Sequence, residues 1–126
     1  MRLLLDTNAL LLALGEPRRL RQETRDELVA PANDVFVSAV SIWEAAIKRA
    51  LGSLDVDPAA LVREIEVEGF SRLLITYDHA VAAGALPLHH KDPFDRMLVA
   101  QAQLESLTIV TSDRKLSAYD VAVLPA

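Results

Sequence analysis

The chain has 126 residues, which fits one domain spanning residues 1–126 and leaves little room for two. It contains no cysteine, so disulfides and zinc–thiolate sites are excluded. The formal net charge of −5 argues against a nucleic-acid binder that relies on a broad basic face, but not against an enzyme that holds a phosphodiester through metal ions and a few arginines.

Strands and helices are predicted to alternate along the chain. In chain order they are a strand at 2–6, helices at 8–14 and 19–30, a strand at 35–38, helices at 40–51 and 58–68, a strand at 72–76, helices at 78–84 and 93–106, a strand at 107–111, a helical turn at 113–117 and a strand at 121–124. Strands that alternate with helices usually pair in parallel. The sequence therefore predicts an α/β fold of three layers, with a central, mostly parallel sheet of four or five strands flanked by helices.

No apolar run approaches the length that crosses a membrane, and the apolar start at residues 2–5 ends at the charged Asp6. That start is too short for the apolar region of a signal peptide. We therefore expect a soluble, cytoplasmic protein with no membrane partner.

Four acidic residues lie near the beginnings of predicted helices, at Asp6, Glu44, Asp95 and Asp113. In an open parallel sheet the carboxyl ends of the strands face one crevice, which is where such folds bind ligands. Carboxylates gathered there repel one another, and a bound divalent cation relieves that repulsion. The pattern predicts a metal site that performs metal-ion catalysis.

Each acid also has a simpler interpretation as a helix cap, because an acid in the first turn satisfies free N–H groups and complements the helix dipole. Ser41 and Glu44 match the capping-box pattern, in which Glu44 would reach back to the Ser41 amide. Asp92 already supplies a good cap for the helix at 93–106, which leaves Asp95 free for another role.

Several other residues are candidates to support such a site or to contact a phosphate. Thr7, Asn8, Thr111 and Ser112 are interpreted either in that way or as ordinary turn and cap residues. Arg96 and Arg114 are expected either to bind a phosphate or to pair with a neighbouring acid. The arginines between residues 18 and 25 form either a solvated helix face or a contact for an RNA backbone or an acidic partner.

Three aromatic side chains are not expected to hold the metal. His89 and His90 lie in the predicted loop at 85–91, where they could contact RNA but are more simply surface histidines without a role. We expect neither to be a metal ligand, because four carboxylates already supply enough oxygens. Trp43 falls on the apolar stripe of the helix at 40–51, so we expect it in the core.

Four segments of the chain, taken in order, resemble the PIN domain, and more narrowly the VapC-type toxins of bacterial and archaeal toxin–antitoxin pairs. They are residues 5–10, 38–44, 90–102 and 110–113. The Asp-Thr-Asn at 6–8 and the Asp-Pro-Phe-Asp-Arg at 92–96 are the most specific parts.

The resemblance implies a metal-dependent endoribonuclease that cleaves RNA with activated water. It implies that one or two Mg²⁺ or Mn²⁺ ions are held at the positions of Asp6, Glu44, Asp95 and Asp113. It also implies a homodimer and inhibition by a small cognate antitoxin, which would contact an apolar groove built by the helices at 8–14, 19–30 and 40–51.

Three alternatives remain open at this point. A scaffold of the same fold could bind RNA or a protein partner without catalysis. A phosphoacceptor receiver domain would carry an adjacent acid pair after the first strand, where this chain has only Asp6. A haloacid-dehalogenase-like phosphatase would carry Asp-x-Asp there, where this chain has Asp6-Thr7-Asn8.

Overall fold

The structure is a computed structural model that describes residues 1–126. Its strands (β), α-helices (α) and 3-10 helices (η) are, in chain order, β1 (Arg2–Leu5), α1 (Thr7–Gly15), η1 (Pro17–Arg19), α2 (Gln22–Val29), β2 (Asp34–Ser38), α3 (Ala39–Ala50), α4 (Pro58–Glu68), β3 (Ser71–Leu73), α5 (Tyr77–Ala85), α6 (Pro93–Glu105), β4 (Thr108–Thr111), η2 (Arg114–Ala118) and β5 (Val123–Pro125). None of the helices has both the length and the apolar character that crossing a bilayer requires.

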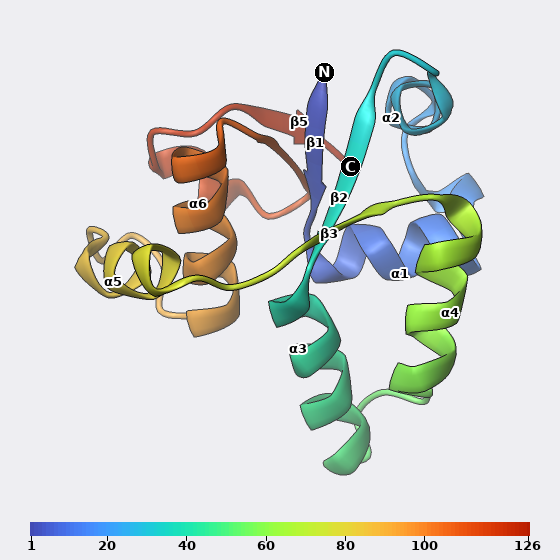
Figure 1. Ribbon diagram of the computed structural model, residues 1–126, viewed down its shortest axis with the longest axis horizontal. Coiled ribbons are helices and arrows are strands. Elements are labelled where there is room, and N and C mark those ends of the chain that lie inside the picture. The colour runs from blue at the N-terminus through green and yellow to red at the C-terminus, as the bar shows by residue number, and fades with distance from the viewer.

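The five strands form one sheet in the order β3-β2-β1-β4-β5, and every neighbouring pair is parallel. Helices α5 and α6 lie on one side of the sheet, and α1 and α4 lie on the other (Figure 1). The predicted α/β class with three layers and a central parallel sheet is therefore confirmed.

Burial on both faces of the sheet follows from the alternation of side chains along β1. Leu3 and Leu5 join one apolar cluster with residues of α1 and α4, while Leu4 joins a second cluster with residues of α6 and η2. All three leucines are fully buried. A strand covered on both faces has a continuous apolar run, which is why the beginning of the chain has almost no polar residues.

The strand order reverses direction between β1 and β4, because β2 and β3 extend the sheet one way and β4 and β5 extend it the other way. Ligands bind at such a switch point, outside the carboxyl ends of the strands. Asp6 directly follows β1, and Asp113 comes two residues after β4. Helices α1 and α3 also begin at this end of the sheet (Figure 1).

Most predicted elements differ from the observed ones by one or two residues at their ends, and two of them differ by more. The strand expected at 72–76 is shorter and earlier, at Ser71–Leu73. The single helix expected at 19–30 is two elements, because η1 ends at Arg19 and the extended backbone of Leu20 and Arg21 separates it from α2.

The prediction that Trp43 belongs to the core is wrong, because its side chain is 60% exposed. Helix α3 buries Val40, Ser41, Glu44 and Ala45 instead. Successive helical residues are rotated by about 100°, so a buried face centred between Ser41 and Glu44 turns Trp43 outward.

Candidate metal centre

Asp6 is both a helix cap and a buried acid of the crevice. Its Oδ1 accepts a hydrogen bond from the Ala9 amide at 2.7 Å, which caps α1, while its own amide donates to the Val110 carbonyl at 3.1 Å. The side chain is 6% exposed. Burial raises the pKa of Asp6; hydrogen bonds from Thr111 and Ala9 lower it, and the charges of Glu44 and Asp113 raise it further.

Glu44 is buried in α3 and is held by two partners that the capping-box interpretation did not include. Ser38 caps α3 by accepting from the Val40 amide at 3.1 Å, so the predicted capping box of Ser41 and Glu44 is wrong. Glu44 instead accepts a hydrogen bond from the Thr7 hydroxyl at 2.5 Å and another from Lys48 Nζ at 2.6 Å. Lys48 was not singled out from the sequence, although its spacing of four residues from Glu44 is the spacing of a helical ion pair.

Asp92 performs the capping role at the start of α6 and leaves the neighbouring acid free, as predicted. Its Oδ1 accepts from the amides of Phe94 at 2.8 Å and Asp95 at 3.2 Å. Asp95 therefore directs its carboxylate to the crevice. Burial and the charge of Asp92 raise the pKa of Asp95 to about 6, with smaller effects from Asp6, His90 and Glu44.

Asp113 caps the short helix η2 and also faces the other acids. Its Oδ1 accepts from the Lys115 amide at 2.9 Å, and its Oδ2 lies 3.0 Å from Nε2 of His90. The same His90 nitrogen lies 2.9 Å from Oδ2 of Asp95. One potential ligand atom from each of His90, Asp95 and Asp113 lies within 4.8 Å of the others.

All four predicted acids line one cavity of about 440 Å³ at the carboxyl end of the sheet. Its wall consists of Asp6, Thr7, Asn8, Leu11, Glu44, Lys48, Ser53, Leu54, Asp92, Asp95, Ser112 and Asp113. Five carboxylates thus face a space whose wall contains a single cationic side chain, Lys48. Such an excess of hard oxygen donors fits a divalent cation such as Mg²⁺ or Mn²⁺.

The predicted supporting residues divide into two groups. Thr7, Asn8 and Ser112 line the acidic cavity. Thr111 and Arg114 line an adjoining cavity of about 310 Å³, which shares Ser112 and Asp113 with the first and also contains Arg21.

Arg96 pairs with no acid and does not line the acidic cavity, and its contact with a phosphate stays a prediction. Its guanidinium donates to the backbone carbonyls of Ala83 and Leu86 at 3.0 Å and of Pro87 at 2.9 Å. Carbonyl acceptors gathered around one guanidinium satisfy it locally, and Arg96 therefore fixes the segment that leads into α6.

His90 is, besides Lys48, a residue whose position at the site the sequence interpretation missed. We expected it to be a loop histidine without a role, and the structure places it against two of the four acids. Its position two residues before the Asp92 cap was the available signal, because a residue so close to the helix start is held near the side chains of the first turn.

The chain was compared with known families and structures. The model of the PIN domain family matches residues 3–122. One similar solved structure is VapBC2 from Rickettsia felis bound to a DNA fragment from its promoter, with a TM-score of 0.70, 16% identity and 98% of each chain covered. A second is FitAcB from Neisseria gonorrhoeae, with a TM-score of 0.65, 24% identity, and coverage of 98% of this chain and 96% of the other. A third is VapBC-1 from nontypeable Haemophilus influenzae, with a TM-score of 0.66, 19% identity, and coverage of 98% of this chain and 97% of the other. At these identities the similarity establishes the fold. No curated protein matches the chain in sequence.

The raised pKa of Asp95 predicts how the metal-free protein responds to pH. Because the folded-state pKa of about 6 is above the unfolded value, the stability linked to Asp95 is fully present below pH 4 and is lost as pH rises through 6. Asp95→Asn should therefore raise the free energy of unfolding by about 1–3 kcal/mol at pH 8 and leave it almost unchanged at pH 4. Urea unfolding of both proteins in EDTA measures this difference, and equal stability at pH 8 would contradict the assigned environment of Asp95.

Proposed function

The chain belongs to the PIN domain family, and we propose that it is a metal-dependent endoribonuclease of the VapC type, the toxin of a toxin–antitoxin pair. The observation that carries the proposal is the convergence of Asp6, Glu44, Asp95 and Asp113 on one cavity. Buried like charges with raised pKa values destabilise a protein unless a ligand compensates them, so such a cluster is a candidate functional site.

In this proposal Asp6, Asp95 and Asp113 hold a Mg²⁺ or Mn²⁺ ion, and Glu44 holds a second ion or orients the attacking water. The bound cation would supply activation of water and stabilisation of the charge that develops on the phosphodiester. The chain orients its own donors in advance: Thr7 fixes one oxygen of Glu44 and Lys48 fixes the other. Asn8 and Ser112 present polar side chains at the same wall, where they can contact the RNA backbone.

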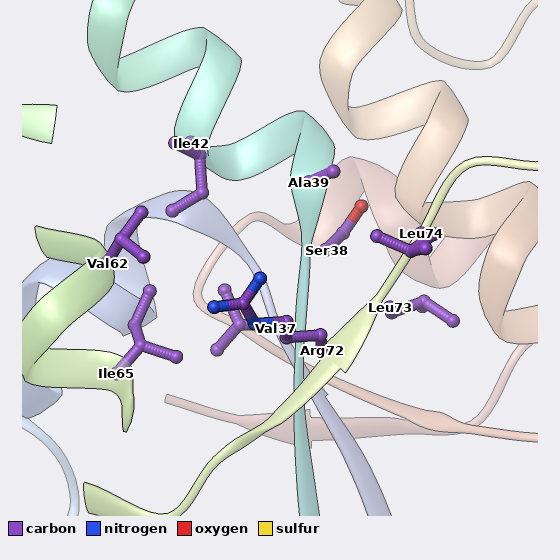
Figure 2. A pocket seen from close by; sticks show the side chains of 9 residues that line it. All are labelled: Val37, Ser38, Ala39, Ile42, Val62, Ile65, Arg72, Leu73 and Leu74. Carbon is purple, nitrogen blue, oxygen red and sulfur yellow. The ribbon is translucent and has the colours of Figure 1, made fainter. Parts of the chain in front are cut away.

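The proposed antitoxin site is an apolar hollow between α3, α4 and β3. Ile42 of α3 and Val62 of α4 lie next to each other on its helix side, and Leu73 and Leu74 lie on the side of the edge strand (Figure 2). An edge strand beside an apolar groove offers a peptide both backbone partners and side-chain pockets. This hollow shares only α3 with the groove expected from the helices at 8–14, 19–30 and 40–51, which stays a prediction.

The proposed homodimer uses the face that carries Trp43. The Trp43 ring stands edge-on to Phe94 with centroids 5.5 Å apart, and beside it lies a cavity of about 280 Å³ with an apolar wall that includes Val40, Ile75 and Met97. A protruding aromatic next to an apolar hollow makes one face self-complementary, which a two-fold dimer requires. Arg96 also lines this cavity, but backbone carbonyls already satisfy its guanidinium.

We expect Asp6→Asn to reduce Mg²⁺-dependent cleavage of single-stranded RNA by at least about 100-fold while the fold survives. Asparagine caps helices as well as aspartate does, so α1 keeps its cap, and removal of one like charge relieves repulsion in the cavity. Circular dichroism checks the fold. Asp120→Asn, at an exposed acid outside the cavity, is the matched control and should cleave like the parent. An Asp6→Asn variant as active as the parent would contradict the proposal, and an inactive parent would leave only a scaffold of this fold.

We expect Trp43→Glu to shift the protein from dimer to monomer, because the substitution places a charge in an apolar contact. Light scattering coupled to size-exclusion chromatography measures the mass. Val67→Glu is the control, since Val67 is an equally apolar and 85% exposed residue on α4, away from this face. A Trp43→Glu variant with the mass of the parent would show that this face is not the dimer contact.

A further inference from the structure

His90 stands between two acids that belong to different parts of the fold. It lies in the loop between α5 and α6, and its side chain is 11% exposed. Its Nε2 is 2.9 Å from Oδ2 of Asp95 on α6 and 3.0 Å from Oδ2 of Asp113 after β4. A single ring nitrogen therefore faces both carboxylates at hydrogen-bonding distance.

The other ring nitrogen determines what Nε2 can do. Nδ1 of His90 accepts a hydrogen bond from the Asp92 amide at 3.3 Å. A nitrogen that accepts from an amide carries no proton, so the proton of the neutral ring is on Nε2. Nε2 is then a hydrogen-bond donor shared by two carboxylates, and its lone pair is not free for a metal ion.

The loop that carries His90 is held in place from both ends. Tyr119, which is buried, accepts a hydrogen bond from the His90 amide at 2.9 Å and donates one to the Pro87 carbonyl at 2.9 Å. Arg96 holds the Leu86 and Pro87 carbonyls from the first turns of α6. These contacts make His90 a rigid feature of the site, which is the property that a residue needs in order to orient others.

We propose that His90 is a positioning residue of the metal centre. Its Nε2–H fixes the Asp95 and Asp113 carboxylates in the arrangement that receives the cation, and so sets the affinity for the metal. The inference rests on the proposed function only in taking these two acids as metal ligands. Partners that orient metal ligands are worth about 10–100-fold in metal affinity in other proteins.

The test is Mn²⁺ affinity, measured by isothermal titration calorimetry at neutral pH on the whole chain without RNA. His90→Ala should weaken Mn²⁺ binding by about 10–100-fold. His90→Gln places an amide N–H near the position of Nε2 and should recover most of the affinity, whereas His90→Asn, whose amide stops at the position of Nδ1, should not. His89→Phe is the matched control and should bind like the parent, because it keeps the edge-on contact of ring 89 with Tyr119 and the His89 imidazole forms no hydrogen bond.

The rescue by glutamine separates orientation from a merely structural role. Asn keeps an acceptor for the Asp92 amide near the position of Nδ1, whereas Gln loses that contact and only Gln reaches the two acids. Equal affinity of His90→Ala and the parent would overturn the inference, as would equal weakening in the Gln and Asn variants. Nitrogen-14 coupling to the bound Mn²⁺ that disappears in His90→Ala would also overturn it, because His90 would then be a direct ligand. RNA cleavage is measured separately: a parent that binds Mn²⁺ as expected and cuts no RNA would refute the proposed function and leave this inference intact.

Discussion

The interaction on which the site depends is repulsion among carboxylates that the fold gathers in a partly buried cavity. Asp6 and Asp95 have raised pKa values because burial disfavours their charged forms and neighbouring acids add to the effect. Lys48 is the only cationic side chain in the cavity wall and bonds to Glu44, while the neutral His90 ring offers a single N–H to Asp95 and Asp113. In the proposed function, a divalent cation bound among these acids relieves their repulsion, and this relief favours binding of the metal.

The sheet makes this concentration of charge possible. Parallel pairing brings the carboxyl ends of β1, β2 and β4 to one edge, and the reversal of strand order leaves a crevice between β1 and β4. Asp6 and Asp113 are fixed by the strands that they follow, while Glu44 and Asp95 come from helices that start at the same edge. The charged groups lie at the ends of elements whose interiors are apolar. Burial of these apolar interiors stabilises the fold and offsets the repulsion among the carboxylates.

Sequence reasoning captured what local chemistry determines. The apolar runs located most strands, and the caps at Asp6 and Asp92 located two helix starts. The four acids singled out from the sequence do lie together at one edge of the sheet. Membership of the PIN domain family then removes the receiver-domain and phosphatase alternatives. Sequence reasoning failed where tertiary packing determines the orientation of a side chain. Periodicity alone could not show that α3 turns Trp43 outward and Glu44 inward. It also missed the roles of His90 and Arg96, because both depend on where a loop without periodicity lies against α6 and Tyr119.

The central claim is that these separated carboxylates share one hard cation, and a crystal grown with Mn²⁺ tests it most directly. The account predicts an anomalous peak inside the acidic cavity, with carboxylate oxygens of Asp6, Asp95 and Asp113 bound directly at roughly 2 Å or through ordered water. His90 should remain hydrogen-bonded to Asp95 and Asp113 without contacting the ion. A cavity without manganese density in a crystal that binds the ion elsewhere, or acids that turn away from one another, would contradict the account.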